Sequence, residues 1–295
     1  MLLRPGKTYD QAIELLDDIT QGGLNDIDNE IPMVGTTSFG QLILPAILSY
    51  ERWTGSAQRQ LRAIFADGVV VDRVRADKYW IIVGSAPSAR TASMMHTELS
   101  ELRSYFLDVA NELRAEKARY SQGPWIVVDT NDLLHYYRLD TIPWSKLYGP
   151  TIRVAIPHVV IDEIDSKSYE AGARIQKRAR GVYRMLEKLL DQLEAKGSVA
   201  LGDGTAFELL ADEIGEARLP NNDDQIVARA TALQQAVSPE VVTLVTRDIG
   251  MRARAIGYGL RVAKIPDKYL ILEDGLSATD MDTALTSISP TAIES

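Results

Sequence analysis

Short apolar runs alternate with helical segments over the second half of the chain, and this alternation constrains the fold more than any other feature. The runs are rich in β-branched residues and read "WIVV", "TIRVAI", "SVAL", "VVTLV" and "LRVAKI". Buried strands that alternate with helices are typical of βαβ units, which build a parallel sheet with helices on both faces. We therefore predict an α/β fold for residues 124–274, with an open parallel sheet flanked by helices.

The preceding region, residues 1–120, has a mainly helical pattern. Apolar residues continue at helical spacing on either side of Pro45, where we expect a break. Two β-rich runs in "DGVVVDRVRADKYWIIVG" then predict a β-hairpin near residues 68–84. The segment "SQGP" breaks the helical pattern and marks the domain boundary, and the small, polar residues 275–295 predict a flexible tail.

A long helix is predicted over residues 93–119. Its apolar residues recur at alternating intervals of four and three, as in a short coiled coil: Met95, Leu99, Leu102, Phe106, Val109 and Leu113. A helix with so few heptads seldom forms a dimer by itself, so packing within the same domain is the preferred interpretation. The alternative is a homo-oligomer that forms through this helix.

Composition excludes several kinds of site. The chain has no cysteine and only three histidines, so thiolate chemistry and histidine-rich metal sites are absent, and a bound metal would be a hard ion with oxygen ligands. A net charge of −9 argues against a protein that coats nucleic acid, although a local basic patch remains compatible with it. No apolar stretch is long enough to span a bilayer, so we expect a cytoplasmic protein without a membrane partner.

Acidic residues follow two of the predicted strands. Asp129 comes directly after "WIVV", and Asp248 comes shortly after "VVTLV". Two helices carry further acids: Glu163 lies about two turns into one, and Asp223 and Asp224 lie in the first turn of another, for which Asn222 is the predicted N-cap. Ligands of open parallel sheets bind beyond the carboxyl ends of the strands, so these acids are predicted to converge there.

A cluster of carboxylates is costly to desolvate, because its members repel one another and burial opposes ionisation. Such a cluster is explained physically if it holds a divalent cation. Mg²⁺ and Mn²⁺ prefer oxygen ligands and are usually shared with substrate phosphates.

At these residues the sequence resembles the PIN-domain ribonucleases. The matching segments occur in family order and are "VVDTNDLL", "VVIDEIDSKSYEAGARIQKRARGVYRMLEKL", "NNDDQIVARA" and "VTRDIGMRARA". The resemblance implies a PIN-like fold and an endonuclease that uses one or two Mg²⁺ or Mn²⁺ ions to cleave single-stranded RNA, leaving a 5′ phosphate and a 3′ hydroxyl. The family's four acids fall on Asp129, Glu163, Asp223 and Asp248, with Asp224 an alternative third acid and with Asn131 and Thr246 as supporting residues.

A basic stretch follows Glu163. Seven Lys or Arg residues between 167 and 188 against two Glu residues leave a charge of +5, which is typical of phosphate contact or of a solvated helix face. The family commonly has basic residues at this place, which favours contact with RNA. The predicted RNA-binding residues, including those that flank Asp248, are Lys167, Arg174, Lys177, Arg178, Arg247 and Arg252.

Other functions fit the sequence less well. A phosphatase of the haloacid dehalogenase type needs a second Asp where Asn131 stands, and a dinucleotide-binding domain needs a glycine fingerprint that is missing. The main alternative is a catalytically silent PIN fold that acts as an RNA-binding or protein-interaction module. A toxin with an antitoxin partner is not favoured over a housekeeping nuclease, because typical PIN toxins are single small domains.

Overall fold

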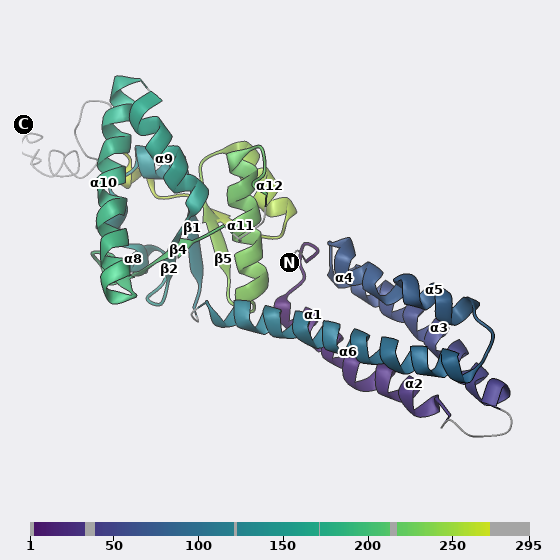
Figure 1. Ribbon diagram of the computed structural model, residues 1–295. Coiled ribbons are helices and arrows are strands. Elements are labelled where there is room, and N and C mark those ends of the chain that lie inside the picture. The colour runs from purple at the N-terminus through teal and green to yellow at the C-terminus, as the bar shows by residue number, and fades with distance from the viewer. Residues whose placement is uncertain (1–2, 33–38, 121–122, 171, 213–216, 272–295) are drawn as a thin grey trace, which may run out of the picture. The chain divides into compact units, whose positions relative to one another are not determined.

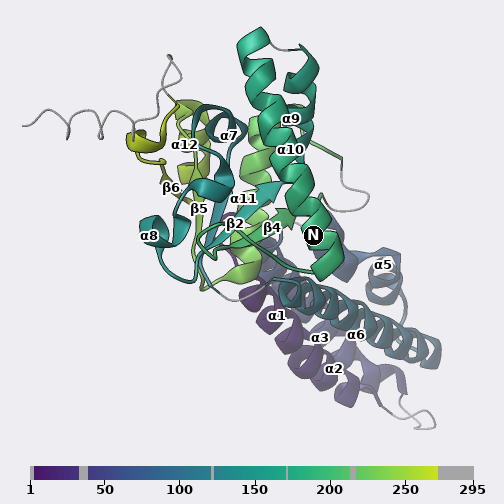
Figure 2. The same cartoon turned by 90° about the vertical axis from the view of Figure 1, so that its left-hand side faces the viewer.

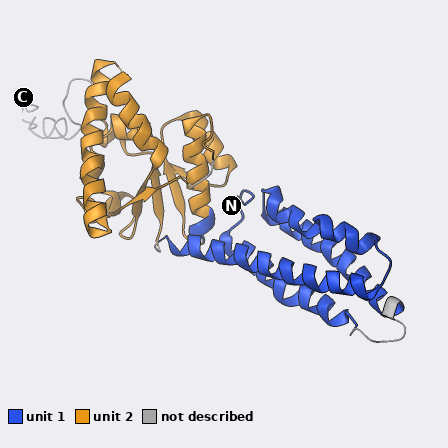
Figure 3. Ribbon diagram, in the orientation of Figure 1, with its two compact units in different colours: residues 1–121, 235–238 blue, residues 122–234, 239–295 orange. Residues whose placement is uncertain are grey.

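The computed structural model describes residues 3–32, 39–120, 123–170, 172–212 and 217–271. The predicted tail, residues 275–295, lies outside these ranges. The chain divides into two compact units: residues 1–121 with 235–238, and residues 122–234 with 239–295 (Figure 3).

The first unit is helical. Its helices are α1 (Tyr9–Asp18), α2 (Leu24–Glu30), α3 (Phe39–Ile64), α4 (Gly68–Asp72), α5 (Asp77–Gly84) and α6 (Ala89–Ala118). Local sequence fixes where several of them begin. At α1, for example, the Thr8 hydroxyl accepts a hydrogen bond from the Gln11 backbone while the Gln11 side chain accepts one from the Thr8 backbone, which is a capping box.

The β-hairpin predicted near residues 68–84 is wrong, because this segment forms α4, a short 3₁₀ turn and α5. Asp67 begins α4 by accepting a hydrogen bond from the Val69 backbone at 2.9 Å. The buried residues of the segment, Val70, Val71, Val74, Tyr79 and Ile82, belong to the apolar core of the unit. Tertiary packing against a helical core therefore outweighs the β propensity of the valines and isoleucines.

The helix predicted over residues 93–119 is α6, and its coiled-coil seam is filled within a single chain. All of the seam side chains are at most 5% exposed, and they lie in one apolar core with residues of α1, α2 and α3. The expected break at Pro45 is also wrong, since α3 continues through it. Proline removes one backbone hydrogen bond, and the burial of Ile43, Ala46 and Ile47 on either side holds the helix together.

The second unit is built on a sheet of six strands in the order β3-β4-β2-β1-β5-β6. The strands are β1 (Trp125–Val128), β2 (Arg153–Pro157), β3 (Val199–Ala200), β4 (Ala206–Leu210), β5 (Val242–Val245) and β6 (Arg261–Ala263). All neighbours pair in parallel except β3 and β4. The α/β class with a mainly parallel sheet is thus confirmed. Strand β4 was not predicted, because its sequence "AFELL" has the Ala, Glu and Leu typical of helices.

Helices cover both faces of this sheet (Figure 1). They are α7 (Thr130–His135), α8 (Trp144–Tyr148), α9 (His158–Glu170), α10 (Ala173–Lys196), α11 (Asn222–Val237) and α12 (Ile249–Gly257). Helices α9 and α10 run side by side in both views (Figures 1 and 2). All side chains of β1 and β5 are buried, as expected for central strands covered on both faces.

The strand order places a topological switch point between β1 and β5. Strands β2, β3 and β4 all lie on one side of β1, with β2 next to it and β3 at the edge. The chain then crosses to the other side of β1 and adds β5 and β6. Crossover connections leave in opposite directions at this point, so a crevice opens beyond the carboxyl ends of the two strands. Asp129 follows β1 and Asp248 follows β5, which puts both residues at the switch point.

Candidate active site

Asp129 lies at the centre of the candidate site. Its side chain is 1% exposed, and one carboxylate oxygen, Oδ1, accepts a hydrogen bond from the Asn131 backbone at 3.4 Å, which caps α7. The other oxygen, Oδ2, accepts one from the hydroxyl of Thr246 at 2.9 Å. Asn131 therefore supports Asp129 through its backbone, and Thr246 supports it through its side chain.

The pKa of Asp129 is raised to about 6, chiefly because burial disfavours the charged carboxylate. The hydrogen bonds from Thr246 and Asn131 oppose this rise, whereas the negative charges of Asp223 and Glu163 add to it. The sheet edge thus carries a carboxylate whose ionised form is stabilised poorly by its own surroundings.

Thr246 links the two acids that follow the central strands. Its hydroxyl donates to Asp129 and accepts a hydrogen bond from the backbone N–H of Asp248 at 3.1 Å. The Asp248 carboxylate caps α12 by accepting from the Met251 backbone at 2.6 Å. Unlike Asp129, Asp248 is exposed.

Glu163 is brought to the same edge by α9. The Thr130 hydroxyl donates a hydrogen bond to its Oε2, and the Asn222 side-chain amide donates one to its Oε1 at 2.8 Å. The predicted N-cap role of Asn222 is wrong, because α11 begins at Asn222 and Asn221 caps it by accepting from the Asp223 backbone at 2.8 Å. Instead, Asn222 holds Glu163.

Asp223 and Asp224 are distinguished by their surroundings. Burial raises the pKa of Asp223, and the charges of Asp248 and Glu163 raise it further, so Asp223 is electrostatically coupled to the other acids. Arg254 opposes this rise through a 3.1 Å contact between its Nη2 and Oδ2 of Asp223. The same guanidinium forms an ion pair with Asp224, whose Oδ1 lies 2.9 Å from Nε.

Asp132 lies beside the candidate site and was not predicted from the sequence. It is 2% exposed, and its pKa is raised to about 7 by burial and then by the charge of Asp129, whereas Arg247 lowers it. Its Oδ2 is buried and has no hydrogen-bond partner among the described residues. The signal in the sequence was its spacing of three residues from Asp129, which places it one helical turn further along α7.

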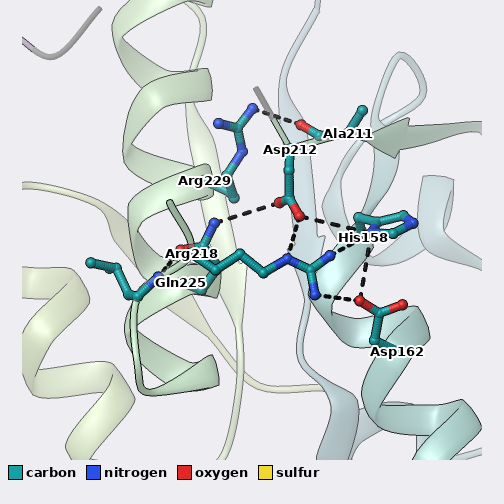
Figure 4. A network of polar contacts seen from close by, with 8 residues as sticks. His158, Asp162, Ala211, Asp212, Arg218, Gln225 and Arg229 are labelled. Atoms are coloured by element: carbon teal, nitrogen blue, oxygen red, sulfur yellow. Dashed lines mark hydrogen bonds and ion pairs between the residues drawn. The ribbon is translucent and has the colours of Figure 1, made fainter. Parts of the chain in front are cut away.

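An ionic network holds the helices that carry Glu163 and Asp223 (Figure 4). Arg218 donates to Asp212 at 2.6 Å and to Asp162, and its Nη2 lies 2.7 Å from Nδ1 of His158. Gln225 of α11 extends the network to Asp212 with a contact of 3.5 Å. Because Asp162 precedes Glu163 on α9, the network fixes this helix near α11.

The chemistry of the donor set fits a hard divalent cation, since Asp129, Glu163, Asp223 and Asp248 offer only carboxylate oxygens. In the described ranges, no group of three or more His, Asp or Glu side chains is arranged to hold an ion. Hydrogen bonds and ion pairs occupy several of these oxygens instead, from Thr246, Asn222 and Arg254. Each carboxylate oxygen keeps a further lone pair, so among these contacts only that of Arg254, which brings a positive charge, competes directly with a cation.

The predicted RNA-binding residues fall in several places. Arg174, Arg178 and Arg247 line one pocket beside α7, and Lys177 lines an adjoining one along α10. Lys167 lies in the last turn of α9, and Arg252 lies on α12.

Fold and site together define an α/β domain with a carboxylate cluster at the switch point of its sheet. The sequence model of the PIN domain family matches residues 126–265, so the C-terminal half of the chain contains a PIN domain. PIN domains are generally nucleases and typically depend on divalent metal ions. A search of curated proteins finds no sequence similar to this chain. No helix in the described part of the chain is long and apolar enough to cross a membrane.

Proposed function

We propose that the second unit is an endoribonuclease that cleaves single-stranded RNA with the aid of Mg²⁺ or Mn²⁺. The observation that supports this best is the buried carboxylate of Asp129. It lies at the switch point with a raised pKa, among acids whose charges add to that rise. A bound cation would offset both the desolvation and the repulsion, which explains why the fold maintains an otherwise costly cluster.

Asp129, Glu163, Asp223 and Asp248 are the residues that would hold the ion. When bound, it would supply charge neutralisation at the scissile phosphate and lower the pKa of an attacking water. Thr246 orients the carboxylate of Asp129 and the backbone of Asp248 together, so the strand ends present both acids in a fixed relation. The basic residues Lys167, Arg174, Lys177, Arg178, Arg247 and Arg252 would bind the phosphates of the strand.

The direct test is cleavage of a labelled single-stranded RNA with Mn²⁺, Mg²⁺ or EDTA. Asp129→Asn and Asp248→Asn keep similar shapes but remove one negative charge each. We expect metal-dependent cleavage that falls at least about a hundredfold in both variants. The exposed Asp165 on α9 provides a matched control, and Asp165→Asn should cleave like the wild type. Full activity of Asp129→Asn would contradict the proposal.

The second candidate is a catalytically silent RNA-binding module, and the contacts of Arg254 favour it. This guanidinium already neutralises Asp223 and Asp224 without a metal. Arg254→Gln separates the two functions, because it removes a cation that competes with the metal. For a nuclease we expect Mn²⁺ to raise the melting temperature at a several-fold lower concentration in this variant. A silent module should show no Mn²⁺-dependent stabilisation in either protein.

A further inference from the structure

A pocket of about 400 Å³ adjoins the acid cluster within the second unit. Its lining comes from α7, from α10, from the loop after β5 and from the segment that holds Leu270 and Ile271. The polar side chains that matter here are Asp132, His135, Arg174, Arg178 and Arg247. The volume is in the range of small-molecule and cofactor sites. Because Asp132 lies one turn of α7 beyond Asp129, the pocket is next to the place where the scissile phosphate would bind.

The arginines of this pocket are held in place by neighbouring groups. Arg178 donates to the Leu134 carbonyl at 3.4 Å, and its Nη1 lies 3.3 Å from Nδ1 of His135. Arg247 pairs with Asp267 at 2.5 Å and lies 5.6 Å from the centre of the Tyr136 ring. Guanidinium groups oriented in this way are suited to a phosphate, since less side-chain entropy is lost when the anion binds.

Asp132 supplies a second and independent feature. Its charge is opposite to that of the three arginines in the lining, it is 2% exposed, and its Oδ2 has no hydrogen-bond partner among the described residues. A buried carboxylate oxygen without a partner is costly, and a ligand that donates a hydrogen bond to it would remove that cost. In a ribonucleotide, the group that donates close to the phosphate is the ribose 2′-hydroxyl.

We propose that this pocket binds the ribonucleotide next to the cleavage position, with its phosphate on Arg174, Arg178 and Arg247 and its 2′-hydroxyl donating to Asp132. The inference rests on the proposed nuclease function and adds the basis on which the domain distinguishes RNA from DNA. DNA has the same phosphates but lacks the donor, so it would leave Asp132 without a partner. The arginines therefore contribute affinity, and Asp132 contributes the preference for RNA.

Binding of fluorescent octanucleotides in EDTA tests this without any cleavage. Three probes of one sequence are compared: all-DNA, all-RNA, and DNA with a single ribonucleotide in the middle. The single ribonucleotide should bind the wild type about tenfold more tightly than all-DNA, which corresponds to about 1.4 kcal/mol. It should also come within about twofold of all-RNA. Replacing its 2′-hydroxyl by fluorine, which cannot donate, should return the affinity to that of DNA.

Variants assign the effect to residues. Asp132→Leu is of similar size and cannot accept a hydrogen bond, so it should abolish the RNA preference, whatever the change in affinity that DNA and RNA share. Arg174→Gln changes an exposed side chain and should weaken all the probes by the same factor. The exposed Asp191 on α10 provides the control, and Asp191→Leu should keep the preference. Circular dichroism establishes that each variant is folded.

Either of two results would overturn the inference: equal binding of the three probes by the wild type, or a preference for RNA that persists in Asp132→Leu. The probe series needs only the wild type, so it decides the question even if that variant does not fold. Neither result bears on metal-dependent cleavage, which the Asp129→Asn assay tests separately. The two proposals can therefore fail independently.

Discussion

Replacing Asp129 by Asn should stabilise the metal-free second unit at alkaline pH. Burial and neighbouring charges raise the pKa of this carboxyl from 3.8 to about 6, so the folded state holds the proton more tightly than the unfolded state. A raised folded-state pKa contributes stability that is fully present below pH 3.8 and is lost as the pH rises through 6. At about 1.4 kcal/mol per pH unit, the whole loss is about 3 kcal/mol.

Asn cannot ionise, so the variant avoids this loss. It also loses part of the hydrogen bonding at Asp129, because its amide nitrogen donates where the carboxylate accepted from Asn131 or Thr246, at a cost of about 1 kcal/mol. The expected net gain at pH 8 is about 2 kcal/mol. At pH 4.5 the folded carboxyl of the wild type keeps its proton, only about 1 kcal/mol is lost, and the net gain is about zero. Removing the charge should also lower the pKa of Asp132, which adds to the gain at pH 8.

Hydrogen exchange measured by mass spectrometry in EDTA is a suitable assay. Peptides from β1 and β5 report the opening of the second unit, because buried central strands exchange mainly through global unfolding. Rates are corrected for the intrinsic pH dependence of exchange. Asp165→Asn, at an exposed position on α9, should show no pH-dependent change. If Asp129→Asn changes the free energy of unfolding by the same amount at pH 8 and at pH 4.5, the electrostatic explanation of the site is wrong.

Two further predictions concern the helical unit. Gly22 lies in a π-helical turn, Ile19–Gly23, between α1 and α2. Gly22→Ala should raise the melting point of the helical unit, since helical Ala is favoured over Gly by up to about 1 kcal/mol and the added Cβ meets no atom within 4 Å. Gly23→Ala should lower the free energy of unfolding by about 1–3 kcal/mol, and with it the melting point, because that Cβ would lie 2.2 Å from Nε1 of Trp53. Arg73→Met should cost about 3–5 kcal/mol in urea unfolding by leaving the fully buried Glu98 without its 2.7 Å partner. Adding Glu98→Leu should restore most of this stability; if it does not, the pair contributes more than charge compensation.

The sequence predicted the second unit well because its strands are central. The residues of β1 and β5 are buried on both faces, so they appear as continuous apolar runs that few other structures explain. It missed β4, which lies further out in the sheet and leaves several side chains partly exposed. The hairpin near residues 68–84 failed for a related reason: short apolar runs fit a strand or a helix equally, and only packing against α3 and α6 decided between them.

The acids at the sheet edge were predictable from their positions after strands and in first helical turns, because parallel strands end at a common edge. Which groups contact them was not predictable. Arg254 reaches Asp223 from a position 31 residues away, and Thr130 reaches Glu163 across 33 residues, distances over which spacing carries no information. The burial of Asp132 was not predictable either, since a charged residue in a short helix is usually exposed.

The sequence by itself determined the parallel α/β unit, its boundary with a helical region and the chemistry of its acids, since these depend on local periodicity and residue type. Only the tertiary structure decided which carboxylates are buried, which are neutralised and where a basic pocket forms around Asp132. The physical reason is that desolvation and Coulomb energy depend on distances through space. The fold sets these distances by bringing together residues that are far apart in the chain.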